Sequence, residues 1–212
     1  ALGAKKFSEL EAGAAEVRSL REFLDWMHAQ LFSKNTSTRI TLMVPVKHKL
    51  RSELRVFLRP SVFPSFSDTR LSVDANSGTG EGVAGVCFCE NLVQRLSPKV
   101  DQTQDGEGYA KETHLPSAKS GGITRRAKYY FAVPIEIADA EHLLGVLIID
   151  NLKQDRILEN ASRTDCNRIE GSIQLVAPWI ARMLNKVPPK LINRASEQQV
   201  NLLMRACRWT GR

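Results

Sequence analysis

The sequence lacks the signatures of several protein classes. No apolar run is long enough to cross a bilayer, so no membrane span is expected within these 212 residues. The four cysteines match neither zinc-binding spacings nor a dense disulfide scaffold, and no CxxC or HxxxH pair occurs. Basic stretches are not interleaved with aromatic residues, which argues against a nucleic-acid surface. We therefore expect reduced thiols, a cytoplasmic location, no metal site and no nucleic-acid partner.

What the sequence does contain is the composition of an ordinary globular protein. Hydrophobic residues make up 42% of the chain and charged residues 25%, which is enough apolar surface for a real core. The net charge of +7 and the pI of about 9.4 indicate a solvated basic surface, or else attraction for anionic ligands, nucleic acid or anionic lipid headgroups. The chain begins at Ala1, so the sequence leaves open an upstream segment that would tether the protein to a membrane.

The first part of the chain has a heptad pattern. Residues from 3 to about 32 are expected to form one long helix, followed by a polar break at 33–37. The two apolar positions of the pattern are occupied by Leu10, Val17, Leu24 and Leu31, and by Gly13, Leu20 and Met27. So narrow a seam fits packing on the chain's own sheet, and it equally fits pairing with the same helix of a second copy.

Two apolar runs later in the chain predict an antiparallel hairpin. They are 129–135 and 142–150, joined by a short polar break. Pro134 cannot donate to a ladder, so we expect it near an edge, a bulge or a strand end. Gly145 predicts that another backbone or a ligand comes close. Further strands are expected at 39–46, 53–59 and 70–74.

A glycine pattern, Gly80-x-Gly82-x-x-Gly85, precedes a predicted helix over 83–92. Its spacing matches a dinucleotide-binding fingerprint, which requires a strand running directly into the glycines and a parallel partner strand. Here a loose loop precedes the glycines and the later strands are expected to be antiparallel, so we reject a nucleotide-cofactor fold. What remains is a helix N-terminus whose N–H groups can hold an anion.

The glycine turn and the two core strands, taken in order, resemble those of GAF domains, which are small-molecule sensing modules. The residues that carry the resemblance are Gly80–Gly85, Phe131–Ile135 and Leu144–Asp150. The resemblance implies an α+β fold, with an antiparallel sheet of about six strands. The N- and C-terminal helices would lie on one face of this sheet, and a pocket helix and a long loop on the other. It also favours the dimer interpretation of the heptads, because flanking helices of such modules commonly dimerise.

The expected organisation has three parts. Residues 1–36 are the dimerising helix, 37–187 the GAF-like sensory domain, and 188–212 a basic tail with a short helix that starts at a capping-box pattern, Ser196–Gln199. Within the domain, the stretch from 98 to about 127 loses its periodicity and is expected to be a structureless lid, a binding loop or a surface loop. Apolar residues from Ile169 onward predict an amphipathic helix that Pro178 should kink or split.

By the same resemblance, a ligand pocket lies between the sheet and the glycine-turn helix, beneath the long loop. Strand alternation places Tyr129, Phe131 and Val133 on one face, and we assign that face to the pocket, although a bulge would exchange the two faces. The predicted ligand-binding residues are Ser77, Thr79, Gly82, Val83, Val86, Cys87, Tyr129, Phe131 and Val133. Each has a structural alternative, which is core packing for the aromatics and turn formation for the glycines.

The function implied is that of a regulatory domain of a signalling protein, which binds an unidentified small molecule and relays its occupancy through the terminal helices to an output or membrane domain outside this sequence. No cofactor is indicated. Two alternatives are a degenerate dimerisation scaffold and an enzyme like the free methionine sulfoxide reductases of the GAF family. That enzymatic branch has a cysteine within its glycine turn, where this chain has Ala84, so we assign no catalytic residue.

Overall fold

The computed structural model describes residues 2–32, 37–48, 51–63, 69–74, 76–99, 105–116, 127–137, 143–151 and 163–194. Its strands are β1 Thr38–His48, β2 Arg51–Leu58, β3 Arg70–Asp74, β4 Thr79–Gly80, β5 Gln94–Leu96, β6 Tyr129–Glu136 and β7 Leu143–Asn151. Its helices are α1 Leu2–Phe32, α2 Gly82–Glu90, α3 Gly106–Glu112, α5 Arg163–Lys186 and α6 Pro189–Arg194.

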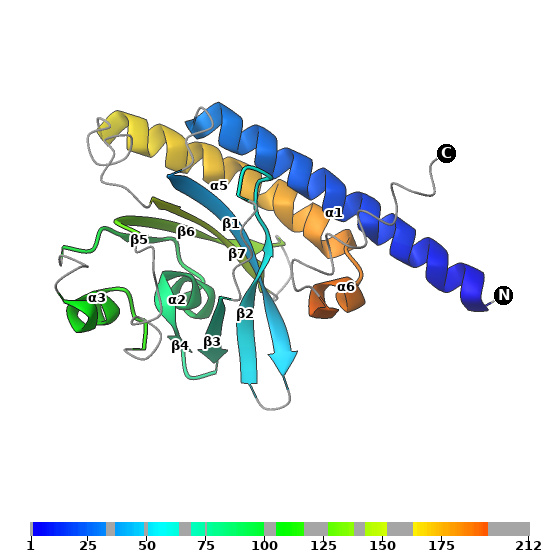
Figure 1. Cartoon of the computed structure of the whole chain (residues 1–212), viewed down its shortest axis with the longest axis horizontal. Coiled ribbons are helices and arrows are strands. Elements are labelled where there is room, and N and C mark those ends of the chain that lie inside the picture. Colours follow the sequence, from blue (N-terminus) through cyan, green and yellow to red (C-terminus); the bar gives the residue numbers. More distant parts are fainter. Residues whose placement is uncertain are drawn as a thin grey trace.

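The seven strands form one sheet in the order β4-β3-β2-β1-β7-β6-β5, and each neighbouring pair is antiparallel (Figure 1). This agrees with the rejection of a parallel nucleotide-binding fold. The sheet has one strand more than the six or so expected, because the turn-rich segment before α2 contributes the two-residue β4.

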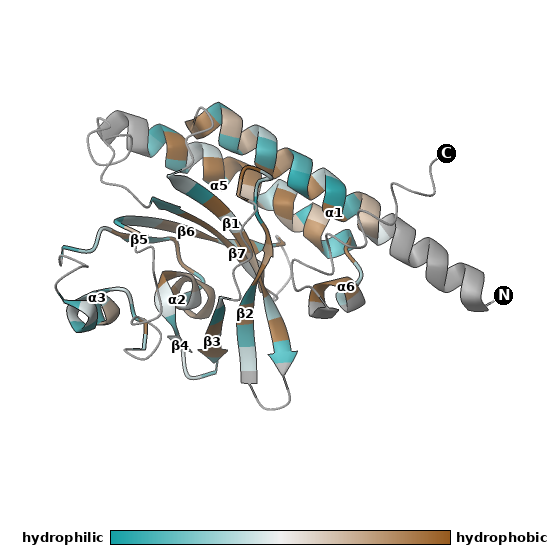
Figure 2. Cartoon of the chain, in the orientation of Figure 1, coloured by the Kyte–Doolittle hydropathy of each residue, from teal (hydrophilic) through white to brown (hydrophobic). Residues whose placement is uncertain are grey.

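Helices cover both faces of the sheet, as expected. Helices α1 and α5 pack side by side on one face, whereas α2 lies on the other (Figure 1). In Figure 2 the ribbons of α1 and α5 alternate between hydrophobic and hydrophilic residues, which is typical of helices that bury one side. Two apolar clusters result, one under α1 and α5 and one under α2. The fold class predicted from the sequence is therefore confirmed.

The heptad seam of α1 is buried within its own chain. The side chains of Val17, Leu20, Leu24 and Met27 belong to the core between α1, α5 and the sheet. The preferred interpretation of these residues as a dimer seam was therefore wrong, and packing on the chain's own sheet is correct. Sequence periodicity could not decide this, because both arrangements bury the same stripe.

Helix α5 continues through Pro178 instead of being split there. Proline removes one backbone donor, but Ala177, Ile180 and Ala181 around it are all buried in the core. Packing on both sides of Pro178 thus outweighs the lost hydrogen bond. The short helix α6 follows, beginning at Pro189, where the fixed φ of proline suits a first helical position. Residues 195–212, with the predicted capping box and terminal helix, lie outside the described residues.

The hairpin of β6 and β7 forms as predicted, between β1 and the edge strand β5. Pro134 lies beyond Ala132, the last residue of β6 that pairs with β5, so it occupies a stretch of β6 that is an edge on that side. At Gly145 a Cβ atom would lie 2.2 Å from the carbonyl oxygen of Met43 on β1. Both positional predictions are confirmed, and the group close to Gly145 is a backbone.

The long segment after β5 is not structureless. It contains α3, whose Tyr109 is fully buried, and whose N-cap Asp105 accepts a hydrogen bond from the Gly108 N–H at 2.8 Å. The prediction missed α3 because seven residues, three of them glycine or alanine, carry too little periodicity to be recognised. The sequence also offers a hinge for this segment at Gly121-Gly122, which lies outside the described residues. Among the helices that the structure describes, none is long and apolar enough to span a bilayer.

Candidate ligand site on the α2 face of the sheet

A bulge in β2 decides which side chains reach the α2 face. Val56 pairs with Met43 and Leu58 with Leu42, so Phe57 is an extra residue in the ladder. Phe57 and Leu58 both join the core under α1 and α5. The alternation then resumes one residue out of step, and Arg59 faces Thr41 of β1, where its Nε donates to the Thr41 Oγ1 at 3.0 Å.

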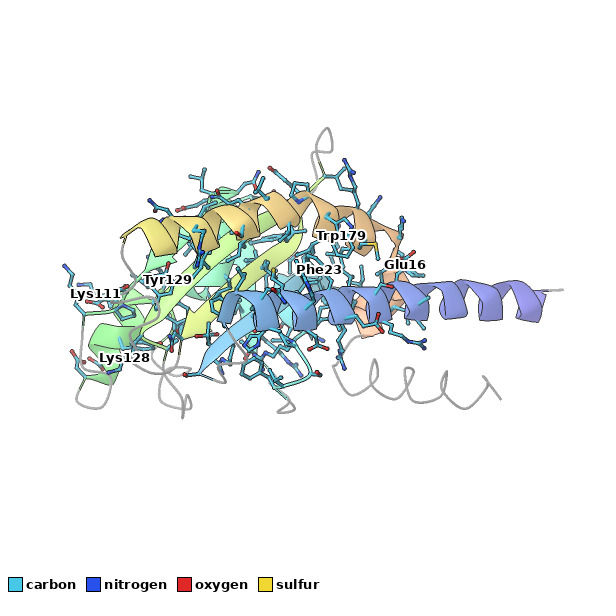
Figure 3. The ribbon with its side chains drawn as sticks, turned by 90° about the horizontal axis from the view of Figure 1, so that it is seen from above. Glu16, Phe23, Lys111, Lys128, Tyr129 and Trp179 are labelled. Carbon is cyan, nitrogen blue, oxygen red and sulfur yellow. The ribbon has the colours of Figure 1, made fainter. Side chains whose placement is uncertain are left out.

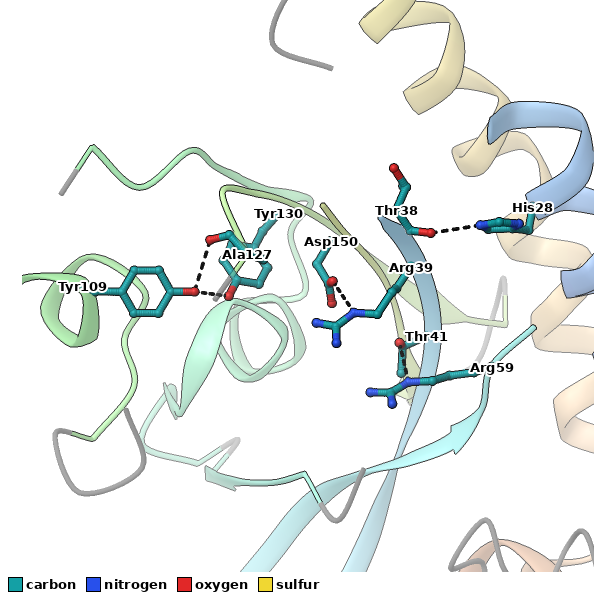
Figure 4. A network of polar contacts seen from close by, with 9 residues as sticks. All are labelled: His28, Thr38, Arg39, Thr41, Arg59, Tyr109, Ala127, Tyr130 and Asp150. Atoms are coloured by element: carbon teal, nitrogen blue, oxygen red, sulfur yellow. Dashed lines mark hydrogen bonds and ion pairs between the residues drawn. The ribbon is translucent and has the colours of Figure 1, made fainter. Parts of the chain in front are cut away.

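A second arginine lies next to this pair on the same face. Arg39 precedes Thr41 by two positions on β1, so their side chains point to the same side of the sheet. Its Nε donates to Oδ1 of Asp150 on β7 at 2.6 Å. Figure 4 shows the guanidinium groups of Arg39 and Arg59 extending in the same direction from neighbouring positions. The ion pair holds Arg39 in place. It also compensates for the desolvation of the Asp150 carboxylate, which is buried.

Two tyrosines complete this polar cluster. The hydroxyl of Tyr109 on α3 donates to the carbonyl of Ala127 at 3.2 Å and is also hydrogen-bonded to the hydroxyl of Tyr130 on β6 (Figure 4). Burial raises the pKa of Tyr130 well above its ordinary value. The proximity of Tyr109 and Asp150 raises this pKa further, and Arg39 opposes the rise. Tyr130 is therefore a neutral hydrogen-bonding group at physiological pH. Together, α3, the strands β1, β6 and β7, and the position after β2 supply Arg39, Thr41, Arg59, Tyr109, Tyr130 and Asp150.

The structure does not bring the predicted pocket residues together. Val83 and Cys87 belong to the apolar cluster under α2, and Val86 beside them is half-buried. Tyr129, Phe131 and Val133 instead lie in the core under α1 and α5, on the opposite face of the sheet. The choice of face was therefore wrong for these three residues. Alternation correctly grouped them, but it contains no information on which helix covers which face.

The glycine turn has a packing role. A Cβ atom on Gly80 would lie 2.2 Å from the backbone of Gly85, so both glycines are needed where β4 meets α2. Gly82 has a φ of 69°, in the left-handed region that favours glycine. Its N–H, which we expected to contact a ligand, donates to the carbonyl of His114 at 2.8 Å. The loop after α3 thus occupies the first turn of α2.

Ser77 lies in the exposed turn between β3 and β4, and Thr79 is the exposed first residue of β4. Their hydroxyl oxygens are 2.7 Å apart, and Ser77 also contacts Asp74. The hydrogen bonds from the Ser77 side chain and from the Asn76 and Ser77 N–H groups lower the pKa of Asp74. These contacts form a closed turn network, which is the structural alternative given above for this segment. Their role in ligand binding stays a prediction.

The cysteines of α2 are poor nucleophiles. Burial raises the pKa of the Cys87 thiol to about 12, and burial also raises the pKa of Cys89. A thiol attacks as its thiolate, so both groups are unreactive near neutral pH. Cys166 lies in the first turn of α5 without a described side chain, and Cys207 lies outside the described residues. No cluster of three potential metal ligands occurs among the described residues.

A buried carboxylate connects the far edge of the sheet to α5. Glu170 on α5 accepts a hydrogen bond from the Tyr129 hydroxyl at 2.8 Å and forms an ion pair with Arg95 on β5. Strand β5 follows α2 directly, through Asn91, which takes a left-handed conformation at the end of the helix. Helix α2 is therefore connected, through the few residues that lead to β5 and the contact of Arg95 with Glu170, to α5 on the opposite face of the sheet.

No protein-family model matches the chain, and neither does any curated protein. Among solved structures, a GAF domain from A. aeolicus in an inactive state is 13% identical, over 87% of this chain and 98% of its own, with a TM-score of 0.46. The GAF domain of an Acinetobacter phosphoenolpyruvate-protein phosphotransferase is 14% identical, over 85% and 93%, with a TM-score of 0.49. A type II free methionine-R-sulfoxide reductase from Thermoplasma acidophilum is 12% identical, over 81% and 96%, with a TM-score of 0.47. GAF domains and an enzyme both occur among these structures, so the likenesses do not assign a function.

Proposed function

We propose that this chain is a GAF-type sensory domain that binds a small molecule at the α2 face of its sheet. The observation that supports this most strongly is the polar cluster of Arg39, Thr41, Arg59, Tyr130 and Asp150 beside the apolar residues under α2. Small-ligand sites combine apolar walls with a few convergent polar groups. A face needed only for packing would have apolar residues at these positions, because buried polar groups are costly.

The signal would pass from this face to the terminal helices. A ligand that contacts α2 shifts the position of β5, which carries Arg95, and Arg95 holds Glu170 of α5. A ligand shifts the equilibrium between two conformations of the domain only if it binds one of them more tightly. The relay therefore requires that the Arg95–Glu170 ion pair differ in strength between the two conformations. Helix α5 packs along α1, and the pair of helices is the route by which an attached domain outside this sequence would be controlled.

The experiment that tests this proposal is native mass spectrometry of the purified chain, compared with its mass after denaturation. Extra mass that is lost on denaturation supports ligand binding and gives the mass of the ligand. Hydrogen exchange of α5, measured with and without that ligand, then tests the relay. A chain that carries no ligand, and whose exchange does not respond to a metabolite extract, contradicts the sensory function and favours the scaffold alternative.

We further propose that the chain forms a homodimer through the outer sides of α1 and α5. Trp26 and Trp179 are exposed there at 56% and 40%, and Leu175 at 82%. The ring of Phe23 lies between the two tryptophans, with its centroid 5.6 Å from that of Trp26 and 4.2 Å from that of Trp179. Figure 3 shows Phe23 and Trp179 next to each other on α1 and α5. Exposed apolar side chains gathered on one surface are typical of interaction sites. This surface replaces the heptad seam as the proposed interface, and a cytoplasmic location remains part of the proposal.

A further inference from the structure

The chemical class of the ligand follows from how Arg39 is held. Its Nε is bound to Asp150, and among the described residues its two terminal amino groups donate no hydrogen bond. A guanidinium has five N–H donors in a rigid plane, and the edge formed by its amino groups matches the two oxygens of a carboxylate or phosphate. An arginine fixed by a buried carboxylate has already lost its side-chain freedom, so binding at its free edge costs less entropy.

Arg59 adds a second positive charge at the same place. It is only 7% exposed, and its hydrogen bond to Thr41 fixes its position next to Arg39. Arg39 and Thr41 are two positions apart on one strand, about 7 Å, so a single small group is within reach of both guanidiniums. An anion is the ligand that two converging arginines favour, whereas a cation would be repelled.

The other side chains of the cluster agree with an anionic group on a small organic molecule. Burial raises the pKa of Tyr130, so this side chain is neutral and adds no negative charge beside the arginines, and its hydroxyl is hydrogen-bonded to that of Tyr109. The neighbouring residues Met43, Ala132 and Ile148 lie on the same face and are apolar, as expected of the surface that holds the carbon skeleton. From this arrangement, and resting on the proposed function, we infer that the domain binds a small organic molecule through its carboxylate or phosphate group, held by Arg39 and Arg59.

The test uses inorganic phosphate and acetate as probes, so it needs no knowledge of the natural ligand. Binding is followed by the NMR signals of the arginine Nε–H groups at constant ionic strength, with chloride as the reference salt. Saturable shifts at Arg39 and Arg59 are expected. In Arg39→Lys the charge is kept but the two-pronged donor edge is lost, and in Arg59→Lys the charge is no longer fixed by the hydrogen bond to Thr41, so the affinity should fall roughly tenfold in each.

The matched control is Arg55→Lys. Arg55 lies on the same strand as the bulge, pairs with Glu53, and alternates to the face away from α2, so phosphate affinity should not change. Equal weakening in all three variants would mean general attraction to a basic protein and would overturn the inference. An absence of saturable shifts in the original chain would overturn it as well.

Native mass spectrometry separates this inference from the proposed function. A bound ligand whose mass corresponds to a molecule without an acidic group contradicts the anionic class but leaves small-molecule sensing intact. No bound ligand, together with no phosphate or acetate binding, contradicts both. A bound carboxylate or phosphate that is lost in Arg39→Lys supports both.

Discussion

The hydroxyl of Tyr129 on β6 donates a hydrogen bond to Oε1 of Glu170 on α5, with 2.8 Å between the two oxygens. Both residues are buried, and the second carboxylate oxygen of Glu170 contacts Arg95. A buried carboxylate is stable only when its oxygens are satisfied. The contact therefore fixes α5 against the sheet, and it explains why a tyrosine stands in a core position on β6.

Removal of this hydrogen bond should destabilise the domain without affecting the α2 face. Tyr129→Phe keeps the ring but leaves one Glu170 oxygen unsatisfied. Hydrogen bonds to charged groups contribute about 1.5–3 kcal/mol, so the free energy of unfolding should fall by about that amount. Urea denaturation measures the change. Glu22→Gln, at an exposed position of α1, is the control and should have no effect. An unchanged midpoint for Tyr129→Phe would show that the contact is not formed in solution.

Two glycine-to-alanine substitutions should act in opposite directions. In Gly145→Ala the new Cβ would lie 2.2 Å from the Met43 carbonyl oxygen, so β1 and β7 must separate, at a cost of about 3 kcal/mol. Gly171 on α5 has no atom within 4 Å of its Cβ position, and alanine there should stabilise the helix by about 0.5–1 kcal/mol. Thermal denaturation of both variants checks the pair. Tolerance of alanine at 145 would contradict the close approach of the two strands.

Cys87 should make the domain sensitive to alkaline pH. The folded-state pKa of its thiol is about 12, against an ordinary value of 9.0. Below pH 9 the thiol is protonated in both states and its contribution to stability is full. Above pH 9 the unfolded chain loses this proton and the folded chain does not, so the contribution falls by up to about 1.4 kcal/mol per pH unit until pH 12.

The measurement is the free energy of unfolding between pH 8 and 10.5 for the original chain and for Cys87→Ala. The variant should be less stable at pH 8 because it leaves a small cavity, but its stability should decline less steeply as the pH rises. Parallel pH profiles for the two proteins would mean that the Cys87 thiolate is not disfavoured in the folded state.

The proposed dimer surface can be tested with two matched leucines. Leu175→Ser changes a side chain that is 82% exposed on α5, and Leu92→Ser changes one that is 61% exposed just after α2. Neither residue contributes to the core, so stability should be unaffected. Sedimentation velocity should show that Leu175→Ser lowers the affinity of the dimer roughly tenfold or more and that Leu92→Ser leaves this affinity unchanged. A monomeric original chain would rule out the surface as a dimer interface.

Much of the fold could be predicted because local chemistry and tertiary structure agree. The β-branched runs around Val133 and Val146 form the hairpin of β6 and β7, and the glycines at 80 and 85 mark the close packing of β4 on α2. Gly145 likewise marked a backbone contact. In each case the constraint acts within a few residues, or through the absence of a Cβ atom, and is visible in the sequence itself.

The candidate site could not be predicted in the same way. Strand alternation correctly puts Tyr130 and Tyr129 on different faces of the sheet. Which face is which depends on where α1, α2 and α5 pack, and alternation contains no information on that. Arg59 was more difficult, because 53–59 alternates polar and apolar residues except for Phe57 followed by Leu58. Three consecutive apolar residues, from Val56 to Leu58, in an otherwise alternating strand were the signal of a bulge, and the partner strand was needed to interpret it.

That extra residue in β2 has a consequence for how the domain could diversify. The residues of β2 before Phe57 pair with β1, and their side chains must fit the packing on the two faces of the sheet. Arg59 comes after the bulge and belongs to neither apolar cluster. A relative with another residue at position 59 could therefore keep the same scaffold and recognise a different molecule. The extra residue Phe57 thus separates the part of the chain that folding constrains from the part that selection for new ligands can change.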